Sequence, residues 1–157
     1  MREIKFRAKN AKDEWVYGSL IINETENNKG TFQVAFIVPG LPCASDGGDF
    51  HTVRMERVKI ETIGQFTGLK DKNGVEVFEG DILKSRSIIH LVEYKEDEGA
   101  FVGRFNSFGA HFPSKPMQQP FYTEICQWWI SKFEKEVIGN IHDNPELLKK
   151  KINFIKN

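Results

Sequence analysis

The chain of 157 residues has only two cysteines, no net charge and no long apolar run. Cys43 and Cys126 are too few for a disulfide framework and favour a reducing cytoplasm. The 22 basic and 22 acidic residues balance, which is atypical of a protein that coats nucleic acid. No stretch approaches the ~20 apolar residues that cross a bilayer, and no apolar segment follows the charged first residues as in a signal peptide. We therefore expect a cytoplasmic protein with no membrane partner.

The sequence also lacks the local motifs of several enzyme classes. It contains no phosphate-binding P-loop, no dinucleotide fingerprint and no Gly-x-Ser-x-Gly nucleophile elbow. Cys43, Asp49 and His51 lie in one segment, but their spacing is not that of a zinc pair and no second pair completes four ligands. Cys126 lies beside two tryptophans and is predicted to be in the core. We therefore predict no metal, no cofactor and no catalytic residue.

What the chain does have is aromatic residues and alternating segments. Its 13 Phe, 3 Trp and 3 Tyr can fill the core of one ordinary domain or two small ones. Alternation and apolar runs predict strands over residues 4–8, 14–22, 31–38, 51–58, 63–69, 75–78, 88–94, 100–105 and 135–141. Gly18 indicates a bulge or close packing. Polar residues 23–30 predict a loop, as do segments 41–50 and 106–119.

Several patterns in the C-terminal half predict its local structure. Asn73-Gly74 between two strand-like segments suits a type I′ hairpin turn, because both residues tolerate positive φ. Gly80 would allow the next turn, with the Asp81 carboxylate bonding nearby backbone amides. Residues 121–133 fit both a strand and a helix. Asn144-Pro145 predicts the start of a short terminal helix, with Asn as the cap and Pro at the first helical position.

Together these patterns predict a mainly β (α+β) protein in two parts. A boundary near residue 60 separates an N-terminal β-rich subdomain, residues 1–60, from a C-terminal subdomain, residues 61–157. The second is predicted to be a small SH3-like β-barrel with the short terminal helix. The barrel prediction rests only on a fold-level analogy: Gly80-Asp81-Ile82-Leu83 resembles the start of a strand in such barrels.

Five blocks of the chain are similar to blocks of a known protein family: residues 1–8, 15–18, 61–74, 76–82 and 137–148. They include Trp15-Val16-Tyr17-Gly18 and the segment ending in Asn73-Gly74. In this order they resemble the YopX family, proteins encoded by phages and prophages of Gram-positive bacteria. The resemblance implies a small protein acting in the cytoplasm of an infected or lysogenic bacterium. The biochemical role of that family is not established, so it supplies no site residues.

One candidate surface is basic. Lys70, Lys72, Arg86 and Arg104 could line a rim of the predicted barrel, with Phe105 or Phe108 stacking on bases. The alternative is an ordinary solvated surface, which the balanced net charge favours. His90 shares a predicted strand face with apolar neighbours, so it is interpreted as a half-buried histidine with its hydrogen bonds satisfied rather than as a metal ligand.

The second candidate surface is aromatic and contains Trp128 and Trp129. On a strand, adjacent rings point to opposite faces, so one would be buried and the other exposed. An exposed Trp flanked by Phe121, Tyr122 and Phe133 would suit a protein interface or self-association, although core packing is the alternative. We therefore predict a non-enzymatic accessory protein that binds a protein partner or forms a homo-oligomer. The alternatives are a nucleic-acid-binding small barrel, and an enzyme or inhibitor in nucleic-acid metabolism that acts through a loop.

Overall fold

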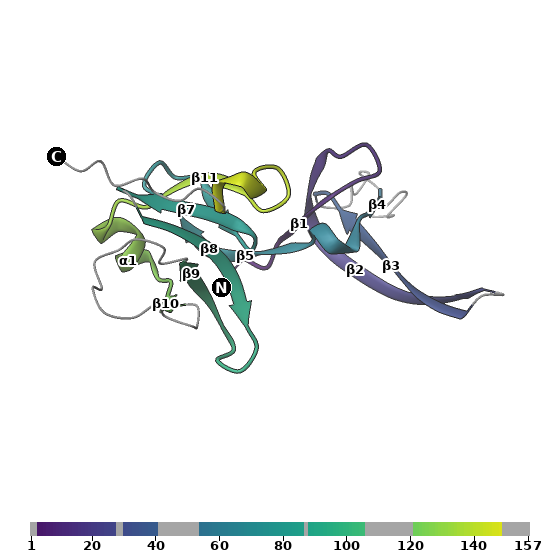
Figure 1. Cartoon of the computed structure of the whole chain (residues 1–157). Coiled ribbons are helices and arrows are strands. Elements are labelled where there is room, and N and C mark those ends of the chain that lie inside the picture. Colours follow the sequence, from purple (N-terminus) through teal and green to yellow (C-terminus); the bar gives the residue numbers. More distant parts are fainter. Residues whose placement is uncertain (1–2, 28–29, 41–53, 87, 106–120, 149–157) are drawn as a thin grey trace. The chain divides into compact units, whose positions relative to one another are not determined.

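The computed structural model describes residues 3–27, 30–40, 54–86, 88–105 and 121–148 (Figure 1). Over these residues the protein is mainly β, with antiparallel strand pairing and one short α-helix, which confirms the predicted class. The chain divides into two compact units, Met1–Phe66 and Thr67–Asn157.

Unit 1 is an antiparallel sheet in the order β4-β3-β2-β1, extended by the first residues of β5. Its elements are β1 (Phe6–Lys9), β2 (Trp15–Asn27), β3 (Gly30–Val38), β4 (Glu56–Val58), the 3-10 helix η1 (Ile60–Thr62) and β5 (Gly64–Lys70). The loop predicted over residues 23–30 is wrong for residues 23–27 and 30, because β2 continues to Asn27 and its residues 19–27 pair with the whole of β3; residues 28–29 lie outside the described residues. The polar side chains of residues 23–26 are exposed, and cross-strand hydrogen bonds hold the backbone extended.

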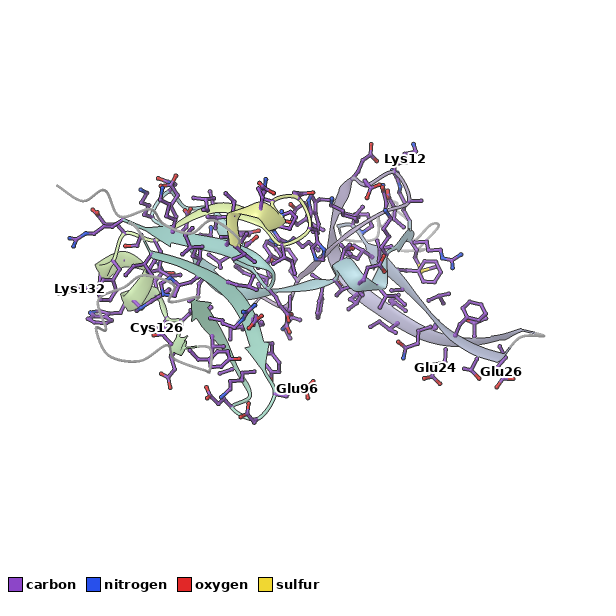
Figure 2. All side chains as sticks on the ribbon, viewed as in Figure 1. Lys12, Glu24, Glu26, Glu96, Cys126 and Lys132 are labelled. Atoms are coloured by element: carbon purple, nitrogen blue, oxygen red, sulfur yellow. The ribbon has the colours of Figure 1, made fainter. Side chains whose placement is uncertain are left out.

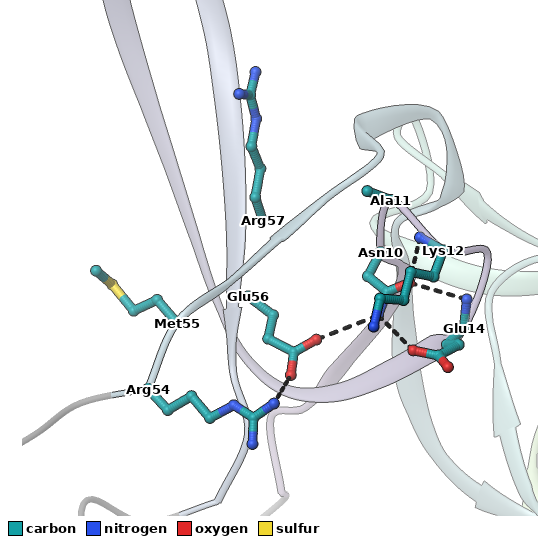
Figure 3. Close-up of a pocket in the computed structure, with 8 residues that line it drawn as sticks. All are labelled: Asn10, Ala11, Lys12, Glu14, Arg54, Met55, Glu56 and Arg57. Carbon is teal, nitrogen blue, oxygen red and sulfur yellow. Dashed lines mark hydrogen bonds and ion pairs between the residues drawn. The ribbon is translucent and has the colours of Figure 1, made fainter.

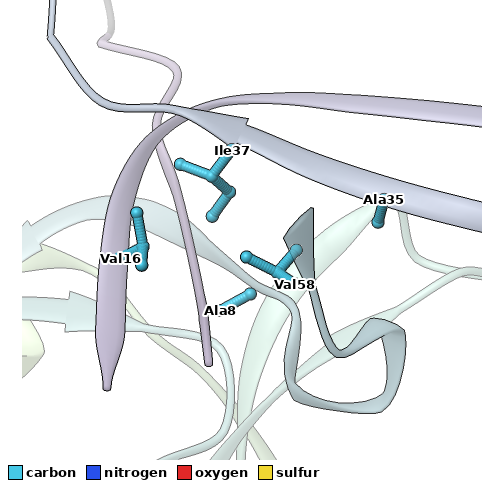
Figure 4. Close-up of a cluster of buried hydrophobic side chains, with 5 residues drawn as sticks. All are labelled: Ala8, Val16, Ala35, Ile37 and Val58. Carbon is cyan, nitrogen blue, oxygen red and sulfur yellow. The ribbon is translucent and has the colours of Figure 1, made fainter. Parts of the chain in front are cut away.

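The core of unit 1 lies on one face of this sheet. Its five buried side chains come from all four strands β1 to β4 (Figure 4) and are Ala8, Val16, Ala35, Ile37 and Val58. Side chains alternate between faces along a strand, so the alternation in the sequence selects which residues enter this core. Gly18 marks a close approach, as predicted, since a Cβ there would lie 2.0 Å from the carbonyl oxygen of Val38.

Unit 2 is built on a five-stranded sheet in the order β10-β9-β8-β7-β11, and β6 pairs with β5. Its elements are β6 (Glu76–Phe78), β7 (Asp81–Ser85), β8 (Ile88–Lys95), β9 (Ala100–Phe105), β10 (Phe121–Glu124), α1 (Gln127–Lys132), β11 (Glu136–Asn140) and the 3-10 helix η2 (Pro145–Leu148). The outer strands of this sheet, β10 and β11, do not pair with each other, so the predicted SH3-like barrel is not confirmed as a closed barrel. The helix predicted to begin at Pro145 is present as one 3-10 turn.

The ambiguous segment 121–133 contains both structures, because strand β10 is followed by helix α1. Trp129 and Ile130 of α1 enter the core of unit 2 with Val77, Leu83 and Val92. Cys126 is exposed at the N-cap position of α1, where its side chain makes no capping hydrogen bond, so its predicted place in the core is wrong. The nearby residues that enter the core are Trp129 and Ile130, three and four positions further along the chain, and Ile125 packs against them.

Two aspartates organise the turns of unit 2. The Asp71 carboxylate accepts hydrogen bonds from the backbone amides of Asn73 (2.7 Å), Val75 (2.9 Å) and Val137 (3.0 Å). A type I′ turn needs positive φ at both Asn73 and Gly74, but only Gly74 has it, at +84°. The type I′ prediction is therefore wrong, and the loop is a turn followed by a glycine in the left-handed conformation. The predicted role of Asp81 is confirmed, since its carboxylate accepts from the Phe78 amide at 2.7 Å.

Candidate interaction surface on helix α1

Two sets of contacts attach helix α1 to the rest of unit 2. The Gln127 side-chain amide donates to the Lys70 carbonyl oxygen (3.0 Å) and its oxygen accepts from the Lys70 N–H (3.2 Å). In addition, Trp129 and Ile130 are buried in the core. A helix of only six residues is not stable by itself, so these contacts determine its position. They also determine where its exposed residues lie.

Trp128 is the most exposed tryptophan described, with 66% of its surface accessible. The Phe133 ring packs edge-on against it, with 6.4 Å between ring centroids, and is itself 47% exposed. The Lys132 ammonium lies 6.0 Å from the Trp128 ring centroid, within the range of a cation–π contact. We call these three residues the Trp128–Phe133 surface. Figure 2 labels Lys132 at this end of unit 2.

The turn after α1 holds Phe133 in place. The Phe133 N–H donates to the Trp129 carbonyl (3.2 Å), and the Ser85 hydroxyl of β7 donates to the Phe133 carbonyl. Glu134 follows with φ +48°, a left-handed conformation that costs a non-glycine residue free energy. The hydrogen bonds made by Phe133 stabilise the turn and offset part of this cost.

Beneath this surface lies a buried cluster of Lys135, His90 and Trp129. The Lys135 side chain is buried, and its Nζ lies 3.3 Å from His90 Nδ1 and 4.3 Å from the Trp129 ring centroid. Burial lowers the pKa of His90 to about 3, helped by the Lys135 charge, and burial lowers the pKa of Lys135 to about 8. His90 is therefore neutral at pH 7, and its Nδ1 accepts from Lys135. As predicted, it is a histidine with a hydrogen-bond partner, but it is more deeply buried.

Two of the four candidate cations, Lys72 and Arg104, are paired with carboxylates. Lys72 pairs with Glu136 at 2.7 Å, and Arg104 pairs with Glu93 at 2.8 Å; the hydrogen bond to Glu136 raises the pKa of Lys72. The Lys70 backbone is bonded to Gln127, and Arg86 lies in the turn between β7 and β8 with φ +52°. Carboxylates therefore neutralise two of the four charges.

Several predicted positions lie outside the described residues. These are Cys43, Asp49, His51 and the loops 41–50 and 106–119. Among the residues that the structure describes, no three His, Cys, Asp or Glu side chains gather as metal ligands would. In the same part of the chain, no helix has the length and apolar character needed to cross a bilayer.

Unit 1 contains an open hollow that the sequence did not predict (Figure 3). It is lined by the segments 10–12 and 54–57 together with Glu14. The Asn10 side-chain amide donates to Glu14 (3.0 Å) and to Glu56 (3.4 Å), and Arg54 pairs with Glu56 at 2.8 Å. Its polar groups therefore bond mainly to each other. The two segments are more than forty residues apart, and neither carries a motif.

Fold and surface together define a mainly β, antiparallel protein with an exposed aromatic surface. A family model, described as YopX protein, matches residues 5–149, and the chain therefore belongs to the YopX family. The solved structure of protein EF1440 from Enterococcus faecalis is 29% identical. That match covers 94% of this chain and 99% of the other, with a TM-score of 0.49. A search of curated proteins found no match.

Proposed function

We propose that this YopX-family protein is a non-enzymatic accessory protein that binds a protein partner in the bacterial cytoplasm through the Trp128–Phe133 surface. The observation that carries the proposal is Trp128, a large aromatic side chain 66% exposed on a helix that is held in position. A phage or prophage origin comes from the family resemblance alone.

The energetic argument concerns Trp128. Tryptophan is the residue most often found at the energetic centre of protein interfaces. Covering the exposed part of its side chain would contribute roughly 3 kcal/mol at about 25 cal/mol per Å². Because α1 and the turn at Phe133 are already ordered by hydrogen bonds, little further conformational entropy is lost on binding.

Charge favours a protein partner over nucleic acid. The net charge is zero, and Lys72 and Arg104 are each paired with a carboxylate. Binding to nucleic acid depends on cations that can displace counterions from phosphates. The nucleic-acid alternative predicts anisotropy changes of labelled DNA or RNA that weaken log-linearly with salt. Such binding, reduced by Lys70→Ala and Arg86→Ala, would replace the proposal with that alternative.

The direct test is photocrosslinking from defined positions. A photoreactive phenylalanine replaces Trp128 in one variant and Tyr94 in the control; Tyr94 is also aromatic and is 44% exposed in unit 2. In an extract of the bacterial host, we expect one discrete protein adduct from position 128 and none from position 94. Excess unlabelled wild-type protein should compete, whereas the Trp128→Ser variant should not. Equal adducts from both positions would contradict the proposal.

A further inference from the structure

The turn between β5 and β6 contains Asn73-Gly74, the one Asn-Gly pair in the sequence. Both residues are exposed, and a Cβ added at Gly74 would meet no other part of the protein within 4 Å. In such a pair the backbone nitrogen of the glycine can attack the side-chain amide of the asparagine, because glycine has no side chain to hinder the approach. The surroundings of Asn73 therefore determine whether its amide reacts in the folded protein.

The side chain of Asn73 makes no hydrogen bond within the part of the chain that the structure describes. Other asparagines differ from it. The side-chain amide of Asn10 donates to two glutamates at 3.0 and 3.4 Å, and that of Asn140 donates to an aspartate at 2.8 Å. Asn144 precedes a proline, whose nitrogen carries no proton, and Asn23 precedes a glutamate in a paired strand. Asn73 therefore combines a free side-chain amide with an unhindered neighbour.

The attacking atom is the backbone nitrogen of Gly74, and the turn restrains it. Its N–H donates to the Asp71 carbonyl oxygen at 3.0 Å. The Asp71 carboxylate also holds the N–H groups of Asn73 (2.7 Å) and Val75 (2.9 Å). The Gly74 N–H must leave its hydrogen bond before it can lose its proton, which should slow the reaction about fivefold relative to an unfolded chain. Exposed turns open more readily than core strands, so this bond delays the reaction without preventing it.

We propose that Asn73 is a modification site, at which the folded protein loses ammonia without an enzyme. The deprotonated Gly74 nitrogen attacks Cγ of Asn73, and the new N–Cγ bond closes a cyclic succinimide. The Cγ–Nδ2 bond breaks, and ammonia leaves with a proton taken from water. Water then opens the ring, giving an aspartate at position 73 if it attacks Cγ and an isoaspartate if it attacks the backbone carbonyl carbon. The reaction consumes only water and releases only ammonia.

The isoaspartate product would loosen the attachment of this turn to β11. Its backbone is longer by a methylene group between positions 73 and 74, and the Asp71 carboxylate bonds to amides on both sides of that point. The same carboxylate accepts from the Val137 amide of β11 at 3.0 Å, and the Lys72 N–H donates to the Lys135 carbonyl at 2.9 Å. Lengthening the turn therefore disturbs the bonds that join it to β11. The aspartate product adds only a charge and should disturb them less.

The first experiment measures which asparagines react. The full-length wild-type protein is kept at mildly alkaline pH in water labelled with heavy oxygen, and peptide mass spectrometry locates each asparagine that exchanges its amide nitrogen for labelled oxygen. The same chain in guanidinium chloride is the unfolded reference. We expect Asn73 in the folded protein to react about fivefold more slowly than in the reference and faster than every other asparagine.

Three results of this experiment would count against the inference. An Asn73 that stays unmodified in the folded protein while it converts in guanidinium chloride would overturn the modification site. An earlier reaction at another asparagine of the folded chain would overturn it as well. Equal rates in the folded and unfolded chains would overturn the restraint assigned to the Gly74 hydrogen bond.

The second experiment tests the consequence by hydrogen exchange. The matched control is Asn73→Ala, which cannot form the succinimide and loses no side-chain hydrogen bond. In the isoaspartate fraction of aged wild-type protein, we expect the Val137 amide to exchange at least about fivefold faster than in fresh protein. Aged Asn73→Ala should be unchanged, and Asn73→Asp should show a smaller effect. Unchanged exchange in the isoaspartate fraction would overturn the loosening of β11, and equal acceleration in aged Asn73→Ala would overturn its assignment to Asn73.

Discussion

The buried pair of His90 and Lys135 makes the protein sensitive to mild acid. The pKa of His90 is lowered in the folded state from its ordinary 6.5 to about 3. Between these values the unfolded chain binds a proton that the folded chain does not, so stability falls as pH decreases. Each pH unit well below 6.5 costs about 1.4 kcal/mol, and lowering the pH from 7 to 5 should cost about 2 kcal/mol from this residue.

The assay is urea unfolding at pH 7, 6 and 5 for wild type and for His90→Asn. The variant keeps a polar side chain but does not titrate, so titration of other groups cancels in the difference. We expect the stability of wild type relative to the variant to decrease by about 2 kcal/mol between pH 7 and pH 5. A difference that stays constant over this range would refute the burial of a neutral His90 against Lys135.

Three further predictions concern the turns and helix α1 and can be measured by urea unfolding. Asp71→Ala removes the acceptor of three backbone amides and should lower the free energy of unfolding by about 3 kcal/mol. The control Asn73→Ala should change it by less than about 0.5 kcal/mol. Equal effects of the two variants would contradict this account of the turn. Gly18→Ala forces a Cβ against the Val38 backbone and should lower the free energy of unfolding by more than about 2 kcal/mol. A neutral effect would show that strands β2 and β3 can move apart at this point. Gln127→Ala removes both hydrogen bonds to Lys70 and should lower the free energy of unfolding by about 1 kcal/mol. It should also reduce photocrosslinking from position 128. Undiminished crosslinking would show that the Gln127–Lys70 bonds are not needed to position Trp128.

Local chemistry made much of the fold predictable from the sequence. Alternation in the first strands selects the residues that enter the core of unit 1, since side-chain direction in a strand has a period of two. Gly80 and Asp81 form the predicted turn because the carboxylate reaches an amide only three residues away. Pro145 begins a helical turn where its fixed φ permits one. Each of these features depends on residues that are neighbours in the chain.

Tertiary structure decided the features that join distant segments. Lys135 meets His90 across 45 residues, and Gln127 meets Lys70 across 57, so neither contact leaves a local pattern. The polar residues 23–27 form a strand only because β3 supplies hydrogen-bond partners. Trp128 is exposed and Trp129 buried on a helix rather than on the strand considered from the sequence. The sequence by itself therefore determined most of the strands and the turn at Gly80-Asp81, whose energetics are local, whereas pairing and burial depend on partners that only the folded chain brings together.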